Sequence, residues 1–450
     1  MDSLRNQRVL VMGLGRFGGG LGVTRWLAGQ GARVTVTDTA PAEKLAASVA
    51  ALRDLIDAGR VVLRLGAHDE RDFTSHDVVI ANPAVPRPWE NPLLNAARAA
   101  GVPITTEIRL VTERLDRRRV IGVTGSAGKS TTSAMIHHAL LRLGHRAHLG
   151  GNIGGSLLDR LTPGADDPIG ASDLVVLELS SAQLHWLGAG VGQPGAPAWS
   201  PRVAVITNIA PNHLDWHGTF EQYRESKMNI TRAQGPGDVL IRSDELLPAR
   251  VIPLRVPGGH NQRNAWTASH AASAMTECSP DEAAAALADF PGLPHRLQLV
   301  AEHDGVRYYN DSKSTTPEAT LLAVASFDDP ARVHLIVGGS DKGADLSPIA
   351  RLGPRLGGLY AIGLTGRRII DLAERVSFVV GCDAASSTRH AVYAETLERA
   401  VAAAMARLRP GDVLLLSPGC ASLDQFANYE ARGEAFAALV RESCEATRVG

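Results

Sequence analysis

Short runs of apolar, β-branched residues alternate with longer helix-forming segments along most of the chain. In the first hundred residues we predict strands at 8–12, 33–38 and 77–81, and helices at 23–29, 42–57 and 92–100. Further strand candidates follow at 120–124, 173–179 and 203–208, and the alternation returns at 333–337, 358–362, 391–408 and 412–416. Strands that alternate with helices are typical of open α/β sheets, so we predict an α/β fold.

The chain is too long for one hydrophobic core. A length of 450 residues suggests about three domains. A second α/β region begins near Ile104, and a third follows the proline- and glycine-rich break at 291–294. We therefore predict domains at 1–103, 104–292 and 293–450, with surface loops at 162–171 and 188–201.

Composition narrows the class of protein. The 46 Lys and Arg residues nearly balance the 47 Asp and Glu residues, so no global field favours nucleic acid or an anionic membrane. The four cysteines match neither a disulfide framework nor a zinc site, which favours a reducing cytoplasm. No apolar run approaches the roughly 18 residues that a membrane span requires. We expect a cytoplasmic protein. Any affinity for phosphate must come from individual sites, because the chain as a whole has almost no net charge.

A glycine-rich turn at 122–132 lies between an apolar strand and a helix-forming segment. Its Gly-x-x-Gly-x-x-Gly-Lys-Ser pattern departs from the usual phosphate-loop expression at Val123, where glycine is expected. Glycines let the backbone fold around an anion, and N–H groups at the helix start donate to it. We predict that Lys129 reaches the β- and γ-phosphates of a nucleotide and that Ser130 reaches Mg²⁺. The alternative is an ordinary glycine-rich turn with a solvated lysine.

A second glycine turn follows the first predicted strand. Gly13, Gly15 and Gly18 have the dinucleotide spacing, and Asp38 comes 20 residues after Gly18 at the end of the next strand. This pattern favours NAD, but the same turn could hold the diphosphate of another nucleotide.

Three later segments place charged side chains at strand ends. Glu178 ends a buried strand and is a candidate Mg²⁺ ligand, although strand-end carboxylates also form simple salt bridges. His213 and His217 flank an aspartate after another strand, and we expect His217 to be structural. Asp311 lies beside Lys313 before a helix-starting proline, which helix capping alone does not explain.

In order, these segments resemble the Mur ligase family over nearly the whole chain. The matching segments are 122–132, 151–154, 177–181, 208–215, 223–227, 260–265, 293–296, 310–313 and 416–426. The segment at 417–433 resembles the D-glutamate-adding member of the family in particular. The resemblance implies three domains: an N-terminal Rossmann-like domain for a UDP-sugar, a central P-loop ATPase-like domain with a mixed sheet, and a C-terminal Rossmann-like domain for the amino acid.

The resemblance also implies the chemistry. ATP would phosphorylate the terminal carboxylate of UDP-N-acetylmuramoyl-L-alanine, and the amine of D-glutamate would then displace phosphate, in peptidoglycan precursor synthesis. Two Mg²⁺ ions and a carbamylated Lys227 are implied as cofactors. The implied partners are these small molecules, with no nucleic acid or membrane, and the protein is expected to be a monomer.

Residue roles follow from the matched positions. The resemblance implies Lys129, His213 and Lys227 as catalytic residues, and Ser130, Glu178, His213 and Lys227 as metal ligands. ATP-binding positions are Gly125, Ser126, Gly128, Lys129, Ser130, Thr131, Asn264, Arg296 and Asp311. UDP-substrate positions are Gly15, Arg16, Phe17, Asp38, Thr39, Asn82 and Asn152. D-glutamate positions are Lys313, Thr315, Lys342, Ser422 and Tyr429.

The chain departs from the family pattern at three places. Ala127 replaces an asparagine of the ATP loop, Ala40 stands where a basic residue is frequent, and the turn that starts at Asn82 replaces a Ser-Pro-Gly type turn. We expect Arg16 to supply the basic contact that Ala40 cannot make.

Other functions remain open at this point. An NAD-dependent dehydrogenase would use Gly13, Gly15, Gly18 and Asp38, but it leaves the segment at 417–433 unexplained. A non-catalytic nucleotide-binding module would not need Lys129, Glu178 and Lys227. A nearer alternative is another Mur or folylpolyglutamate-type ligase that shares the central domain.

Overall fold

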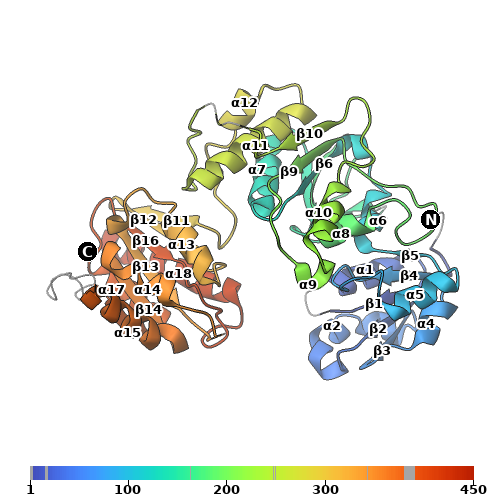
Figure 1. The fold of residues 1–450 in the computed structure, drawn as a ribbon, viewed down its shortest axis with the longest axis horizontal. Coiled ribbons are helices and arrows are strands. Elements are labelled where there is room, and N and C mark those ends of the chain that lie inside the picture. Colours follow the sequence, from blue (N-terminus) through green and yellow to red (C-terminus); the bar gives the residue numbers. More distant parts are fainter. Residues whose placement is uncertain are drawn as a thin grey trace. The chain divides into compact units, whose positions relative to one another are not determined.

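The computed structural model describes residues 4–15, 19–162, 164–246, 248, 250–341, 343–379 and 391–449. They form two compact units (Figure 1). The first comprises Met1–Arg250 and Arg263–Leu287, and the second comprises Val251–Gln262 and Ala288–Gly450. None of the described helices is both long and apolar enough to cross a membrane.

The first sheet of the first unit is parallel and has the order β3-β2-β1-β4-β5. Its strands are β1 (Arg8–Met12), β2 (Arg33–Asp38), β3 (Val61–Leu65), β4 (Val78–Ala81) and β5 (Ile104–Thr105). The accompanying helices are α1 (Gly19–Gly29), η1 (Ala42–Leu45), α2 (Ala46–Ala50), α3 (Arg53–Asp57), α4 (Glu70–Ser75), α5 (Pro92–Ala99) and α6 (Glu107–Thr112). The strand order reverses at β1, because β2 lies on one side of it and β4 on the other; such a switch point is where α/β sheets bind ligands.

The single helix predicted at 42–57 is wrong. The structure divides it into η1, α2 and α3, with non-helical φ values of −114° at Leu45 and −105° at Leu52. Both leucines are buried, with exposed fractions of 2% and 0%. Packing of these two side chains into the core therefore overrides the helix propensity of the alanine-rich sequence.

The second sheet has the order β10-β9-β6-β8-β7. Its strands are β6 (Val120–Thr124), β7 (Ala147–Gly151), β8 (Leu174–Glu178), β9 (Val203–Ile206) and β10 (Val239–Arg242). The helical elements around it are η2 (Arg117–Arg119), α7 (Lys129–Arg142), η3 (Asp159–Leu161), α8 (Ser181–Trp186), α9 (Leu214–His217), α10 (Phe220–Met228), α11 (Gly259–Met275) and α12 (Pro280–Ala285). All its described strand pairs are parallel rather than mixed, because each strand returns through a crossover connection.

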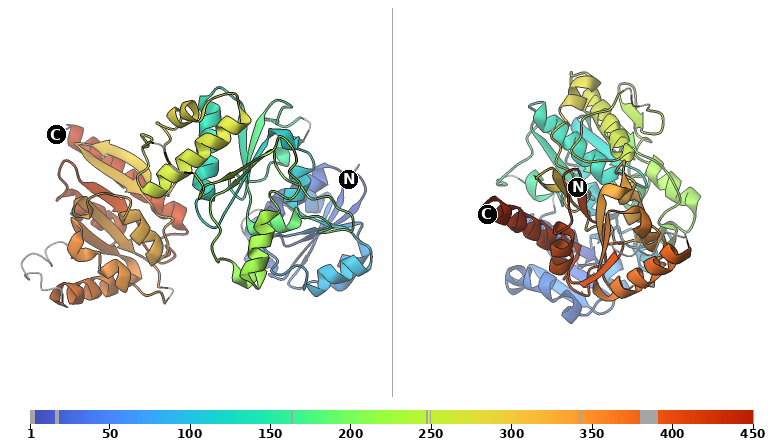
Figure 2. Two further views of the ribbon diagram at one scale, coloured as in Figure 1. Left: turned by 45° about the horizontal axis from the view of Figure 1, so that its top comes forward. Right: turned by 90° about the vertical axis from the view of Figure 1, so that its left-hand side faces the viewer.

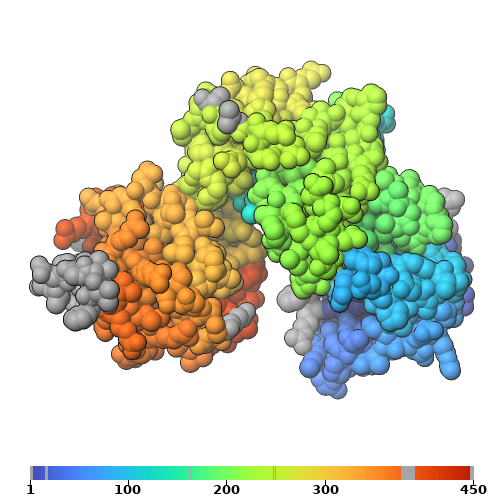
Figure 3. Space-filling view, in the orientation of Figure 1, coloured from blue at the N-terminus to red at the C-terminus, as the bar shows by residue number. Residues whose placement is uncertain are grey.

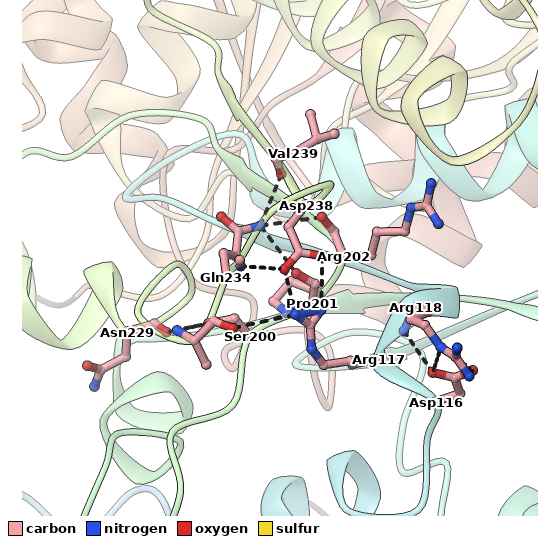
Figure 4. Close-up of polar contacts among 12 residues, drawn as sticks. Asp116, Arg117, Arg118, Ser200, Pro201, Arg202, Asn229, Gln234, Asp238 and Val239 are labelled. Carbon is pink, nitrogen blue, oxygen red and sulfur yellow. Dashed lines mark hydrogen bonds and ion pairs between the residues drawn. The ribbon is translucent and has the colours of Figure 1, made fainter.

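Polar contacts hold the amino ends of three strands of this sheet together (Figure 4). Arg117, before β6, forms a two-point ion pair with Asp238, before β10, at 2.5 and 3.0 Å. The Nε2 of Gln234 donates to the carbonyl group of Pro201, just before β9, and to that of Val239, the first residue of β10. This edge of the sheet is thus occupied by structural contacts, and the opposite, carboxyl edge carries the candidate site.

The third sheet fills the second unit and has the order β11-β12-β16-β13-β14-β15. Its strands are β11 (Gln298–His303), β12 (Val306–Asn310), β13 (Val333–Gly338), β14 (Gly358–Ile362), β15 (Ala391–Glu395) and β16 (Val413–Leu416). Its helices are α13 (Pro317–Val324), η4 (Pro330–Arg332), α14 (Ser347–Ala350), η5 (Gly353–Arg355), α15 (Gly363–Val379), α17 (Leu397–Met405) and α18 (Tyr429–Val449). The β11–β12 hairpin is antiparallel and the other described pairs are parallel.

The two units are built around separate cores. One continuous cluster joins the first two sheets and includes Val11 of β1 and Ala204 of β9, and the surfaces of these two parts adjoin in Figure 3. The third sheet is buried on both faces, because neighbouring residues Leu335 and Ile336 belong to different clusters; helices lie on each side of it (Figure 2). The α/β fold class is confirmed, whereas the domain boundaries at 103/104 and 292/293 stay predictions.

Candidate active site

The loop between β6 and α7 owes its shape to two glycines. Gly125 has φ 150° and Gly128 has φ 81°. A Cβ on Gly125 would collide with Oγ1 of Thr207, and a Cβ on Gly128 would lie 2.9 Å from Oδ1 of Asn264. The loop therefore brings its backbone against the carboxyl end of β9, and the first N–H groups of α7 have no acceptor within the helix. Such a helix start favours an anion.

Lys129 begins α7, and its ammonium lies over the loop. Its Nζ donates to the carbonyl oxygens of Gly125 at 2.9 Å and Ser126 at 3.3 Å. Ser130 and Thr131 follow in the first turn of α7. The structure thus brings together one cation, one hydroxyl pair and the N–H groups of a helix start.

Asn208 supports the loop at Ala127. The family pattern has an asparagine at that position, and here the Asn208 side chain binds the backbone of Ala127. The Oδ1 of Asn208 accepts from the Ala127 N–H at 3.0 Å, and its Nδ2 donates to the Ala127 carbonyl at 3.3 Å. The hydroxyl of Ser126 donates to the carbonyl of Ala210 at 2.8 Å. The loop is therefore anchored to the segment after β9 without a side chain from position 127.

Glu178 ends β8 with a buried carboxylate that is only half satisfied. Its Oε1 accepts from Nδ2 of Asn152 at 2.8 Å, whereas its Oε2 has no hydrogen-bond partner in the described parts of the chain. A buried carboxylate oxygen without a partner is costly unless a cation neutralises it. Carboxylate oxygen is also a preferred Mg²⁺ ligand, so Glu178 fits a magnesium site.

A magnesium ion here would need ligands beyond the usual acidic cluster. No group of three or more His, Cys, Asp or Glu side chains within the described residues could hold a metal by itself. Mg²⁺ in nucleotide sites commonly takes one or two protein oxygens and completes its shell with phosphates and water. Glu178 and the hydroxyl of Ser130 are the protein oxygens that suit this arrangement.

Lys227 is buried on α10, with an exposed fraction of 1%. Its Nζ donates to the Gly125 carbonyl at 2.8 Å and to Oγ1 of Thr124 at 3.3 Å. Burial lowers the pKa of Lys227 to about 7, the positive charge of Lys129 adds to this fall, and Glu178 opposes it. The amine is thus poised to be neutral near physiological pH, which is unusual for a lysine.

Tyr223 joins this group, and we did not predict it as a site residue. Its hydroxyl shares a hydrogen bond with Oγ of Ser126 at 2.7 Å, and its ring lies 4.8 Å from Nζ of Lys227. The only sequence signal was its place in the segment 223–227. One face of α10 therefore carries both residues that contact the loop.

The two histidines after β9 have different environments. His213 is exposed, lies immediately before α9 with φ 50°, and its ring centre lies 6.4 Å from that of Tyr223. His217 is buried, shares a hydrogen bond with Oγ of Ser181 at 2.9 Å, and burial lowers its pKa to about 4. A neutral, buried His217 fits the structural role expected of it, and His213 is the histidine that ligands can reach.

In the first glycine turn, Asp38 binds backbone rather than facing solvent. Its Oδ2 accepts from the N–H groups of Leu14 at 2.9 Å and Gly15 at 3.1 Å, and its Oδ1 accepts from Ala40. Both oxygens thus help to hold the shape of the glycine turn. Thr39 is exposed beside it. Arg16 and Phe17 lie outside the described residues.

Asp311 follows β12 in the second unit, where ligand binding is expected at the strand ends. Its Oδ2 accepts from Oγ of Ser417 at 2.7 Å, and its Oδ1 accepts from the N–H of Leu297 at 3.1 Å. Burial raises the pKa of Asp311 to about 6, although these hydrogen bonds and the charge of Arg296 oppose the rise. Arg296 itself is exposed, so its guanidinium is accessible beside a buried acid.

Of the residues predicted to bind D-glutamate, the structure brings Lys313 and Tyr429 close together. The ammonium of Lys313 lies 5.2 Å from the ring centre of Tyr429. Ser422 is buried, and Thr315 is half-buried in the loop after β12. Lys342 lies outside the described residues.

Arg432 is a further residue of this region that we did not predict. It is fully buried, and its guanidinium donates to the hydroxyl and carbonyl of Ser312 and to the carbonyl of Cys420. Arg432 thereby ties the loop after β12 to the loop after β16. Nothing in the local sequence distinguished it from an exposed helix arginine.

Three family models match the chain. They are the MurD-like N-terminal domain of Mur ligases over residues 7–106, the Mur ligase middle domain over 123–252, and the glutamate ligase domain over 295–420. Their order is that of the three sheets.

Curated relatives match almost the whole chain. A UDP-N-acetylmuramoylalanine–D-glutamate ligase of Geobacter metallireducens is 36% identical and covers 97% of this chain and 98% of its own. One of Roseiflexus sp. is 37% identical and covers 97% and 99%.

Solved structures share the fold. The UDP-N-acetylmuramate-alanine ligase MurC of Thermotoga maritima has a TM-score of 0.54 at 19% identity, covering 97% of this chain and 100% of its own. The MurF ligase of the same organism, in complex with ADP, has a TM-score of 0.51 at 18% identity, covering 88% and 92%.

Proposed function

The chain belongs to the Mur ligase family, and from this premise we propose that it joins D-glutamate to UDP-N-acetylmuramoyl-L-alanine at the expense of ATP. The observation that carries the proposal is the convergence of Lys129, Glu178 and Lys227 around one glycine-rich loop. This arrangement suits phosphoryl transfer, and the relatives of similar length are named for this ligation.

The reaction proceeds in two steps. The terminal carboxylate of the UDP-substrate attacks the γ-phosphorus of ATP, which releases ADP and forms an acyl phosphate. The amine of D-glutamate then attacks the acyl carbon, phosphate leaves, and the amine loses a proton as the amide forms. Activation is needed because a free carboxylate is a poor acyl donor, and the protein contributes chiefly by positioning and by charge stabilisation.

The loop residues supply this positioning. The N–H groups at the start of α7 bind phosphate oxygens, and Lys129 moves from the loop carbonyls to the phosphate charge. Asn264, which lies against Gly128, is proposed to contact the adenosine. Arg296 and Asp311 of the second unit are proposed for the same nucleotide.

We assign the magnesium ligands to Glu178, Ser130 and His213, with the carbamate of Lys227 as the fourth. Two Mg²⁺ ions would neutralise charge that develops on the transferred phosphoryl group. The unpaired Oε2 of Glu178 supports this assignment.

Carbamylation is proposed for Lys227 because an ammonium there adds positive charge beside Lys129. Reaction of the neutral amine with CO₂ releases a proton and yields an anionic carbamate, whose oxygens suit Mg²⁺. Burial of Nζ lowers the pKa of this amine to about 7, so a substantial fraction of it is neutral near pH 7 and can react with CO₂.

The two remaining substrates are proposed to bind at strand ends. Gly15, Arg16, Phe17, Asp38, Thr39, Asn82 and Asn152 are assigned to the UDP-substrate, and Lys313, Thr315, Lys342, Ser422 and Tyr429 to D-glutamate. We further propose that the enzyme acts as a cytoplasmic monomer on these small molecules, without nucleic acid or membrane partners.

An omission experiment tests the reaction. Incubation with ATP, Mg²⁺, UDP-N-acetylmuramoyl-L-alanine and D-glutamate should yield ADP, phosphate and a product heavier by one glutamyl residue, detected by mass spectrometry. Leaving out any one substrate should abolish the product. Phosphate release that is independent of the UDP-substrate, or reduction of added NAD, would refute the proposal.

A further inference from the structure

The turn after β4 packs directly against the first glycine turn. We call residues 82–88 the substrate turn. The Oδ1 of Asn82 accepts from the Ala84 N–H at 2.9 Å, and its carbonyl accepts from Val85 at 3.0 Å. A Cβ on Gly13 would lie 3.1 Å from Nδ2 of Asn82. The substrate turn therefore shares the carboxyl edge of the first sheet with the glycine turn.

Trp216, in the connection between β9 and β10 of the second sheet, forms hydrogen bonds near both ends of the substrate turn. The indole Nε1 of Trp216 donates to the carbonyl of Pro83 at 3.0 Å, and the backbone carbonyl of Trp216 accepts from the N–H of Arg87 at 3.0 Å. Arg87 has φ 42°, a conformation that a non-glycine residue adopts only when its surroundings impose it. Trp216 thus fixes the geometry of the turn from outside its own sheet.

Trp216 is also tied to the residues near the proposed magnesium ligands His213 and Glu178. The N–H groups of Trp216 and His217 both donate to the carbonyl of His213, at 3.1 and 3.0 Å. His217 is bonded to Ser181, which lies three residues beyond Glu178. The helix α9 therefore connects the substrate turn to the start of α8, just after β8, through direct hydrogen bonds.

Aromatic packing makes this connection stiff. The Trp216 ring centre lies 4.3 Å from that of His217, 5.7 Å from that of His185 and 5.8 Å from that of Trp89. Trp89 follows the substrate turn, and His185 belongs to α8. Because packed interiors deform little, a shift of the substrate turn must move α9 with it.

We propose that Trp216 is a positioning residue that couples the substrate turn to His213, which immediately precedes α9. Through this coupling, binding of the UDP-substrate and binding of the nucleotide each strengthen the other. The inference rests on the proposed function, since it takes the substrate turn as part of the UDP-substrate site. Trp216 touches neither reacting group, and it acts by holding Pro83 and Arg87 in register with His213. Coupling of this kind is reciprocal, so it can be measured from either ligand.

The test is a coupling factor measured by calorimetry on the full chain. The affinity for UDP-N-acetylmuramoyl-L-alanine is determined with and without saturating Mg²⁺ and a non-hydrolysable ATP analogue. Wild type should bind the UDP-substrate more tightly with the analogue. Trp216→Phe keeps an aromatic ring but loses the indole N–H, and should lower the coupling factor by about tenfold, which corresponds to about 1.4 kcal/mol, the scale of one hydrogen bond.

Trp26→Phe is the matched control. Trp26 of α1 is also buried. Its Nε1 likewise joins the first sheet's part of the chain to the second's, because it donates to Oγ1 of Thr162, before β8, at 2.9 Å. Its loss should lower the melting temperature similarly while the coupling factor stays at the wild-type value. The proposal is overturned if wild type shows no coupling, if Trp216→Phe retains it, or if both variants lose it equally. Failure of the proposed function would instead appear as wild type that does not bind the UDP-substrate at all.

Discussion

Replacing Asp311 with asparagine should stabilise the second unit at neutral pH. Burial raises the pKa of Asp311 from 3.8 to about 6, so the folded state binds its proton more tightly than the unfolded state does. Between about pH 4 and pH 6 this carboxyl makes the free energy of unfolding fall as pH rises, and above pH 6 the whole penalty is present. A shift of about two pKa units corresponds to a penalty of about 3 kcal/mol.

Asparagine has nearly the same shape and carries no charge. Its Oδ1 can still accept from Leu297, and its amide can donate to the hydroxyl of Ser417. Asp311→Asn should therefore raise the melting temperature of this unit by up to about 6–12 °C at pH 7.5. The gain should shrink steadily as the pH falls from 6 toward 4 and should vanish only below about pH 4, where the unfolded chain also binds this proton.

Differential scanning calorimetry at several pH values between 4.5 and 8 measures both effects. Asp412→Asn is the control, because Asp412 is equally buried, at 5% exposure, but is paired with Arg332 at 3.2 Å. That variant should be destabilised, since it removes the ion pair with Arg332 and weakens the hydrogen bond that the Asp412 carboxylate accepts from the Arg409 N–H. Identical stability of wild type and Asp311→Asn across the pH range would refute the idea that Asp311 is held in a desolvated site.

Three further substitutions test the other site residues. Lys129→Ala should lower kcat by at least about 100-fold, because it removes one preorganised charge contact to the phosphates, and near-normal turnover would remove the loop from the mechanism. Lys227→Ala should be nearly inactive in the ligation assay and partly rescued by added acetate, whereas full activity in CO₂-depleted buffer would refute the carbamate. Arg16→Ala should raise the KM for the UDP-substrate and leave that for ATP nearly unchanged; an unaltered KM for the UDP-substrate would contradict its assignment.

The local pattern was sufficient to predict the elements that carry the site. The glycines and Lys129 could be placed at a junction of strand and helix because an apolar, β-branched run precedes them and helix-forming residues follow. Glu178 could be placed at a strand end because four consecutive apolar residues, 174–177, precede it. The fold class followed from the alternation of strands and helices, and the family followed from the order of the segments.

Contacts between distant residues could not be predicted from pattern alone. Asn208 supports Ala127 across 81 positions, and Arg432 reaches Ser312 across 120. Pairings of this kind depend on the tertiary fold, and each residue by itself is typical of a loop or a helix surface. Short edge strands such as β3 and β11 were likewise missed, because their half-exposed residues give weak periodicity.

The identity of the amino acid that is joined tests the account most directly. Phosphate release from ATP is measured with UDP-N-acetylmuramoyl-L-alanine and, in turn, D-glutamate, L-glutamate, meso-diaminopimelate or L-lysine. We predict release with D-glutamate and little with the other three. Equal rates with L-glutamate, or a preference for either diamino acid, would contradict the assignment.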